Sequence, residues 1–230
     1  MQYSIALIDV DDTLLDFGRS ERAALADAFA AFDIPFCEET AVRYHEINDA
    51  LWKRLEKGEI DRPQLWEKRF AQLFGELGRP LPEGLNARYM ESLATQAFPV
   101  DGAAEMLRQA SQLARLFVVT NGVGQVQRRR LKKTGLDVFF EGVFISHELG
   151  AQKPSRAYFD KVFAAIGPVD RSRVVLLGDS LTSDMKGART AGVTACWYCP
   201  DRQKPDVLGA YDIRIARLGQ FVDVLKGSLQ

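Results

Sequence analysis

The chain has 230 residues, of which 47% are hydrophobic and 27% charged, as in soluble globular proteins and unlike disordered ones. Thirty basic and 31 acidic side chains give a formal net charge of −1, so no electrostatic attraction to nucleic acid or to an anionic membrane is expected. No apolar run approaches the roughly 20 residues that span a bilayer, and Met1–Val10 lacks the basic start of a signal peptide. The cysteines Cys37, Cys196 and Cys199 fit a reducing compartment, and we expect a cytoplasmic location.

The first part of the chain predicts one strand followed by helices. The apolar run Tyr3–Val10 predicts the strand, and the amphipathic stretches after it are punctuated by glycines and prolines. The expected helices are Ser20–Phe32, Glu38–Lys57, Pro63–Phe74 and Leu85–Ala97. We therefore expect residues 17–98 to form an inserted helical domain.

Further strands are expected only after this insertion. They are Leu116–Thr120, Gly142–Ser146, Val174–Leu177, Val193–Tyr198 and Asp212–Ala216. Strands that alternate with helical stretches are typical of βαβ units and of a doubly wound parallel sheet. Residues 1–16 and 99–230 are therefore expected to form an α/β core domain.

Polar clusters follow the expected strands. These clusters are Asp9–Thr13, Thr120–Gly122, Lys153-Pro154 and Gly178–Asp184, the third after a short loop. In an open α/β sheet, ligands bind at the carboxyl ends of the strands. We therefore expect the four clusters to meet at one edge of the sheet.

The residue types in these clusters suggest phosphoryl chemistry. Five aspartates would converge at the edge: Asp9, Asp11, Asp12, Asp179 and Asp184. Carboxylates so close together repel, and a hard divalent cation such as Mg²⁺ would compensate them. Thr120, Asn121 and Lys153 add hydrogen-bond donors and a positive charge for an anionic phosphoryl group. An aspartate can attack phosphorus, and a second carboxyl two residues on can transfer protons.

Taken together and in this order, the clusters resemble the four motifs of the haloacid dehalogenase superfamily. They are Asp9-Val10-Asp11-Asp12-Thr13-Leu14, Val118–Gly122, Gln152-Lys153-Pro154 and Gly178–Asp184. The expected helical insertion lies between the first and second motifs, as in subfamily I of that superfamily. The resemblance spans essentially the whole chain and implies a Rossmann-like core with an α-helical cap.

The resemblance also implies a metal ion and a covalent mechanism. Asp9 would be the nucleophile and Asp11 the general acid and base. Mg²⁺ would be held by the side chains of Asp9 and Asp179 and by the backbone carbonyl of Asp11, with Asp184 behind these direct ligands. The substrate would be a small phosphate ester.

Phosphate binding and substrate class are implied in the same way. Thr120, Asn121 and Lys153 would hold phosphate oxygens, and Lys153 would also neutralise charge beside the nucleophile Asp9. Asp12 stands where many members have glycine. This variant, the fourth motif and the cap segment Leu51–Ile60 are similar to a branch of pyrimidine nucleoside 5′-monophosphate phosphatases that clean the nucleotide pool.

Other functions remain open on the sequence alone. A phosphosugar or phosphoglycolate-type phosphatase, or a mutase, would share the motifs and differ in the cap. A 2-haloacid dehalogenase needs the first aspartate but neither a metal nor Asp11, so Asp11 and Asp179 argue against it. A non-catalytic phospho-ligand-binding protein would need no nucleophile paired with an acid. Either a monomer or a homodimer is compatible with the sequence.

Several single residues also have two interpretations. Asp184 is either a member of the site or a charge in the first turn of a helix. Trp52 is either part of the cap core or a surface on which a nucleobase stacks. The basic run Arg128–Lys133 is expected to be a solvated helix face, and His147 a solvated loop residue.

Overall fold

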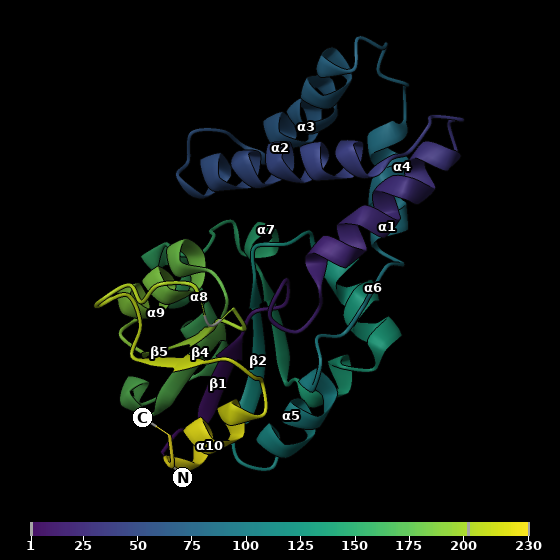
Figure 1. Cartoon of the computed structure of the whole chain (residues 1–230). Coiled ribbons are helices and arrows are strands. Elements are labelled where there is room, and N and C mark those ends of the chain that lie inside the picture. Colours follow the sequence, from purple (N-terminus) through teal and green to yellow (C-terminus); the bar gives the residue numbers. More distant parts are fainter. Residues whose placement is uncertain (1, 202, 230) are drawn as a thin grey trace. The chain divides into compact units, whose positions relative to one another are not determined.

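The computed structural model describes residues 2–201 and 203–229, and the chain divides into two compact units (Figure 1). One unit contains the residues up to Asp16 together with those from Phe98 onward. The other unit is Phe17–Ala97. None of the helices in the described part of the chain is long and apolar enough to cross a bilayer.

The first unit is built on a parallel sheet. Within the described residues, six strands lie in the order β3-β2-β1-β4-β5-β6. They are β1 (Ile5–Ile8), β2 (Arg115–Thr120), β3 (Gly142–Ile145), β4 (Val174–Gly178), β5 (Thr194–Tyr198) and β6 (Ile213–Ile215). Every neighbouring pair is parallel, which confirms the doubly wound sheet expected from the alternation of strands and helices.

Helices cover both faces of this sheet (Figure 1). They are α5 (Ala103–Ala110), α6 (Gly124–Thr134), α7 (Ser146–Leu149), α8 (Arg156–Ile166), α9 (Lys186–Ala191) and α10 (Gln220–Lys226). Successive strand residues point to opposite faces, so Ile5 and Leu7 pack with α8 and α9, whereas Ala6 and Ile8 pack with α5 and α10. Burial on both faces explains why the strands appear in the sequence as continuous apolar runs.

The order of the strands determines where a ligand binds. From β1 the chain moves outward through β2 and β3, then returns to the other side of β1 with β4. The carboxyl ends of β1 and β4 therefore lie at the switch point, where open α/β sheets bind ligands. Ile8 pairs with Leu177, and the backbone N–H of Asp9 donates to the carbonyl of Leu177 at 2.9 Å. This register brings the residues that follow the two strands together.

The second unit is helical. It contains α1 (Phe17–Ala30), α2 (Glu38–Glu56), α3 (Arg62–Glu76) and α4 (Leu85–Leu93). Its core includes the stacked rings of Tyr44 and Phe70, with centroids 4.9 Å apart, and the ring of Tyr89 packs edge-on against both. α1 begins three residues before the expected Ser20, and α4 ends four residues before the expected Ala97.

Candidate active site

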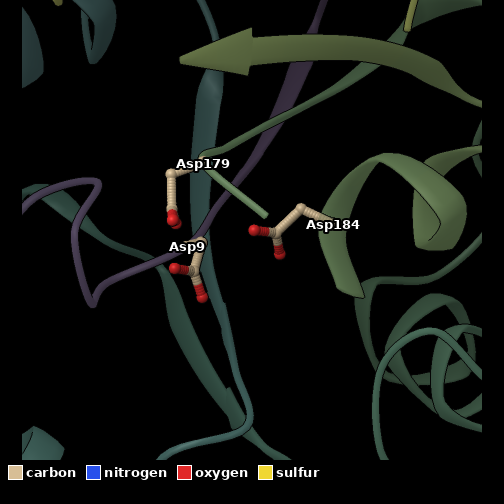
Figure 2. A group of neighbouring side chains, drawn as sticks. All are labelled: Asp9, Asp179 and Asp184. Carbon is tan, nitrogen blue, oxygen red and sulfur yellow. The ribbon is translucent and has the colours of Figure 1, made fainter. Parts of the chain in front are cut away.

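Three carboxylates gather at the carboxyl edge of the sheet (Figure 2). Asp9 directly follows β1, and Asp179 directly follows β4. Asp184 lies in Leu181–Met185, a π-helical turn that leads into α9. One carboxylate oxygen from each of the three aspartates lies within 4.8 Å of the others. The structure therefore brings the first and fourth sequence motifs into one cluster.

Lys153 is the cation inside this cluster. Its side chain is buried, and its Nζ donates to Asp9 Oδ1 at 2.6 Å and to Asp184 Oδ1 at 2.6 Å. A third bond, 2.9 Å long, goes to the carbonyl oxygen of Val119. An ammonium has three hydrogens, so these bonds use all its donors and hold it in one position.

Asp184 is buried and paired with Lys153, and is not a solvated charge at the start of a helix. It is 1% exposed, and its second oxygen, Oδ2, accepts the backbone N–H of Ser180 at 3.1 Å. Both of its oxygens therefore already accept hydrogen bonds. This agrees with a place behind the direct ligands of a metal.

The charge balance of the cluster favours a divalent cation. Burial raises the pKa of Asp9 well above its usual value; Lys153 opposes this shift, and Asp184 and Asp179 add to it. Burial also raises the pKa of Asp179 to about 8, with the carboxylates of Asp184 and Asp12 adding to the effect. One lysine therefore does not neutralise the cluster. Carboxylate oxygens are the ligands that Mg²⁺ prefers, so this donor set fits a magnesium ion.

Two buried side chains hold Asp179 in place. The hydroxyl of Thr13 donates to Asp179 Oδ1 at 3.2 Å. The indole Nε1 of Trp197, on β5, donates to the backbone carbonyl of Asp179 at 2.8 Å. Neither contact is predicted from the sequence, because a threonine within a motif and a tryptophan within a strand also fit a core.

Gly178 leaves room for Asp184. A β-carbon at this position would lie 2.3 Å from Asp184 Oδ2 and 2.4 Å from its carboxyl carbon. Atoms do not approach so closely, so any side chain at position 178 would displace the carboxylate. Glycine is therefore required at position 178 because Asp184 lies so close, and not because of the backbone dihedral angles.

We expect Gly178→Ala to weaken metal binding and turnover. Displacement of Asp184 would also disturb Lys153, and changes behind the direct ligands typically cost about 10- to 100-fold in metal affinity or activity. Titration of activity with Mg²⁺ measures the effect. Gly219→Ala is the matched control, because a β-carbon at position 219 meets nothing within 4 Å. Equal Mg²⁺ dependence of the two variants would contradict this role for Gly178.

The side chain of Asn121, directly after β2, connects this end of the strand to the segments that carry Lys153 and Ser183. Its Nδ2 donates to the backbone carbonyl of Lys153 at 3.0 Å, and its Oδ1 accepts the backbone N–H of Lys153 at 2.9 Å. Nδ2 also donates to Ser183 Oγ at 3.3 Å. The side-chain amide of Asn121 therefore positions the lysine, and phosphate binding by Asn121 stays a prediction. Phosphate binding by Asn121 would fall to its backbone N–H.

The hydrogen bonds to Thr120 fix the direction in which its hydroxyl group donates. Its Oγ1 accepts the backbone N–H of Gly122 at 3.0 Å and the Nε2 of Gln127 at 3.1 Å. A hydroxyl oxygen has two acceptor positions, and these bonds use both. The hydroxyl hydrogen is therefore left to donate, as binding of a phosphate oxygen requires.

The first motif turns sharply after Asp11. Asp12 has a φ of 56°, in the left-handed region that glycine adopts readily and aspartate tolerates better than most residues. Aspartate can therefore stand at a position where, by the resemblance described above, glycine is expected in many members of the superfamily. The carboxylate of Asp11 is not among the three that gather in the cluster, and it contacts residues of α6 instead.

The predictions for the basic run and for the isolated residues have mixed outcomes. Arg128 and Arg129 are exposed as expected, but Arg130 is 1% exposed, so the solvated-face prediction is wrong for Arg130. His147 is exposed on α7. Trp52 is half-buried on α2, with the Arg62 guanidinium 5.6 Å from its ring centroid. Stacking of a nucleobase on Trp52 stays a prediction.

Known proteins resemble this chain over most of its length. A family model described as haloacid dehalogenase-like hydrolase matches residues 3–192. The HAD-hydrolase YfnB of Bacillus subtilis is 36% identical over 93% of this chain and 92% of its own. A crystal structure of YfnB bound to magnesium superposes with a TM-score of 0.90, at 35% identity, over 98% of this chain and 99% of that one.

Two further relatives have more specific names. The pyrimidine 5′-nucleotidase PynA of Streptococcus pneumoniae is 34% identical over 87% of this chain and 85% of its own. The pyrimidine 5′-nucleotidase YjjG of Escherichia coli is 31% identical over 90% of this chain and 91% of its own. With the strand order and the four motifs at one edge of the sheet, these matches identify the chain as a member of the haloacid dehalogenase-like hydrolase family.

Proposed function

We propose that this protein is a Mg²⁺-dependent phosphomonoesterase that forms an aspartyl-phosphate on Asp9 and acts on pyrimidine nucleoside 5′-monophosphates. The observation that carries the proposal is the Asp9 carboxylate held by Lys153, at 2.6 Å, within a buried acidic cluster. Phosphoryl transfer depends mainly on positioning and on charge stabilisation, and this arrangement supplies both. Relatives named pyrimidine 5′-nucleotidase support the substrate class.

In the first step, a carboxylate oxygen of Asp9 bonds to phosphorus, and the ester bond to the leaving oxygen breaks. The leaving oxygen takes a proton from the carboxyl of Asp11. The products are an aspartyl-phosphate, a free alcohol and an Asp11 carboxylate. The Thr120 hydroxyl donates a hydrogen bond to a phosphoryl oxygen, and the ammonium of Lys153 balances the negative charge of Asp9 and the phosphoryl group.

In the second step, a water oxygen bonds to phosphorus while the Asp11 carboxylate takes a proton from that water. The bond between phosphorus and Asp9 breaks, which returns the Asp9 carboxylate and releases inorganic phosphate. The carboxyl of Asp11 is then protonated, ready for the next substrate. Each step moves one proton, and the enzyme returns to its starting form.

The residues assigned to the metal are Asp9 and Asp179 through their side chains and Asp11 through its backbone carbonyl. Bound there, Mg²⁺ supplies positive charge to the phosphoryl oxygens as negative charge builds up on them. We assign substrate selection to the helical unit Phe17–Ala97, acting as a cap. The polar side chains of the four motifs, in the core domain, bind the phosphoryl group. Recognition of the rest of the substrate is therefore assigned to the cap, which carries the aromatic side chain of Trp52.

A phosphomonoester panel tests this function. Purified protein with Mg²⁺ is expected to hydrolyse UMP, dUMP and dTMP with a kcat/KM at least about tenfold above that for AMP, GMP, glucose 6-phosphate or phosphoglycolate, since one or two extra contacts give that discrimination. EDTA is expected to abolish turnover, and Mg²⁺ to restore it. A preference for sugar phosphates would contradict the substrate class, and EDTA-resistant hydrolysis would contradict the metal. Release of halide from a 2-haloacid would instead favour a dehalogenase.

A further inference from the structure

A buried polar network links α6 to the first and second motifs. Gln127 and Arg130 lie three residues apart on α6, and each is 1% exposed. Arg130 Nη1 donates to Asp11 Oδ1 at 2.5 Å and to Gln127 Oε1 at 3.1 Å. Gln127 Nε2 donates to Asp11 Oδ2 at 2.6 Å and to Thr120 Oγ1 at 3.1 Å. Both oxygens of Asp11 are therefore held by α6.

The network permits only one orientation of the Gln127 amide. Its two hydrogens point to Asp11 and Thr120, and its oxygen accepts from Arg130. Rotation of the amide by half a turn would place its oxygen against the Asp11 carboxylate, and neither of those groups could donate. The amide therefore fixes the position of the Asp11 carboxylate and leaves the Thr120 hydroxyl to donate.

Room for this amide is reserved by a glycine of the second motif. A β-carbon at Gly122 would lie 2.2 Å from Gln127 Nε2 and 2.7 Å from its amide carbon. The same glycine donates its backbone N–H to Thr120 Oγ1. Gly122 therefore leaves room for the Gln127 amide, which is one donor to the Thr120 hydroxyl, and its own backbone N–H is the other donor.

Stability alone does not explain a buried arginine at this position. Burial of a guanidinium costs desolvation and side-chain entropy, and replacement of buried ion pairs by apolar residues is often neutral or stabilising. The neighbours Val126 and Leu131 on α6 are buried and apolar, so an apolar residue would also suit this face. The arginine is better explained by the group that it contacts.

We propose that Arg130 and Gln127 are positioning residues of the active site. They hold the Asp11 carboxyl where it exchanges protons with the leaving oxygen and with water, and Gln127 directs the Thr120 hydroxyl hydrogen toward the phosphoryl group. The proposal deepens the proposed function and rests on it. Neither side chain is assigned a contact with the substrate.

The first test compares leaving groups. p-Nitrophenyl phosphate has a leaving group that needs little protonation, whereas phenyl phosphate and UMP have more basic ones. General acid–base catalysis contributes about 10²- to 10⁴-fold, so a misplaced Asp11 should remove a substantial part of it. Arg130→Met is expected to slow formation of the phosphoenzyme about 10- to 100-fold with phenyl phosphate or UMP, but only a few-fold with p-nitrophenyl phosphate, in rapid-quench measurements. Gln127→Met is expected to raise KM as well, because Thr120 loses a partner.

The matched control is Arg129→Met, which removes the same charge from an exposed position of the same helix. We expect its rates to match those of the wild type for every leaving group. Arg130→Lys keeps a cationic donor, and we expect it to recover part of the loss. If Arg130→Met fails to fold by circular dichroism, Gln127→Met gives the same leaving-group readout with Arg130 in place.

A double-mutant cycle separates positioning from a structural role. If Arg130 acts through Asp11, Arg130→Met should change the rate less than about twofold in an Asp11→Asn background, since residues that act as a unit are not additive. The proposal would be overturned if the rate losses of Arg130→Met and Asp11→Asn multiplied fully in the double mutant. It would also be overturned if Arg130→Met slowed the reaction equally with every leaving group. Either result would leave the phosphatase function intact. A wild-type protein that hydrolyses no phosphate ester with Mg²⁺ would overturn the proposed function and the positioning roles together.

Discussion

Replacement of Asp9 by asparagine is expected to reduce turnover by about 10⁴-fold or more while leaving the fold intact. An amide is too weak a nucleophile to form the bond to phosphorus, and loss of a nucleophile commonly removes most of the catalysis. The substitution keeps the shape of the side chain, which is 7% exposed, and it removes one charge from a cluster that has an excess of negative charge. Steady-state hydrolysis of p-nitrophenyl phosphate and circular dichroism measure the two effects.

Detection of the covalent intermediate makes this test specific. Wild-type protein quenched in acid during turnover is expected to carry one phosphoryl group on the peptide that contains Asp9, and the Asp9→Asn variant to carry none. Asp223→Asn serves as the control, since Asp223 is an exposed aspartate of α10. Substantial turnover by the Asp9→Asn variant would rule out covalent catalysis by Asp9.

Replacement of Lys153 by methionine is expected to lower both activity and stability. Methionine has a similar length but no charge, so Asp9 and Asp184 would lose the buried cation that bonds to both at 2.6 Å. Removal of one partner from a buried ion pair typically costs about 3–5 kcal/mol, because the remaining charge stays buried. Urea unfolding in EDTA measures the loss in the free energy of unfolding. We expect Mg²⁺ to restore part of it, because the cation replaces some of the missing positive charge.

The control for this prediction is Lys132→Met, which removes an exposed lysine of α6. Its free energy of unfolding should remain within about 0.5 kcal/mol of the wild-type value, as for most surface substitutions. A Lys153→Met protein that is as stable as this control in EDTA would show that the buried ion pairs make no net contribution. Wild-type kcat in the same variant would remove Lys153 from the proposed mechanism.

The sheet was predictable from the sequence because its strands are buried on both faces. Val174–Leu177 lies fully inside β4, and Leu116–Thr120 lies inside β2, since continuous apolar runs leave little freedom in where a strand lies. The ends of the helices were predicted less accurately than the strands. The expected start of α1 was Ser20, but Ser20 is buried within the helix, which begins at Phe17. An amphipathic pattern determines a face more clearly than an end.

The acidic cluster was predictable for a related reason: parallel strands carry the residues that follow them to one edge, whatever their separation in the chain. The contacts of α6 were not predicted. The run from Arg128 to Lys133 looks like one charged surface in the sequence, yet the helix turns Arg130 inward beside Gln127. Their spacing from the apolar residues Val126 and Leu131 was the available signal. Packing, rather than charge, decides which arginine of such a run becomes buried.

The bond pattern of Asn121 has a consequence for the evolution of this protein. Its amide holds both the N–H and the carbonyl of Lys153, which lies 32 positions further along the chain. The backbone of Lys153 is therefore held directly beside the end of β2, across an intervening segment that includes the edge strand β3. We therefore expect insertions and deletions in the outer turns of that segment to leave Lys153 in place, so that this side of the molecule can change in length while the chemistry is kept.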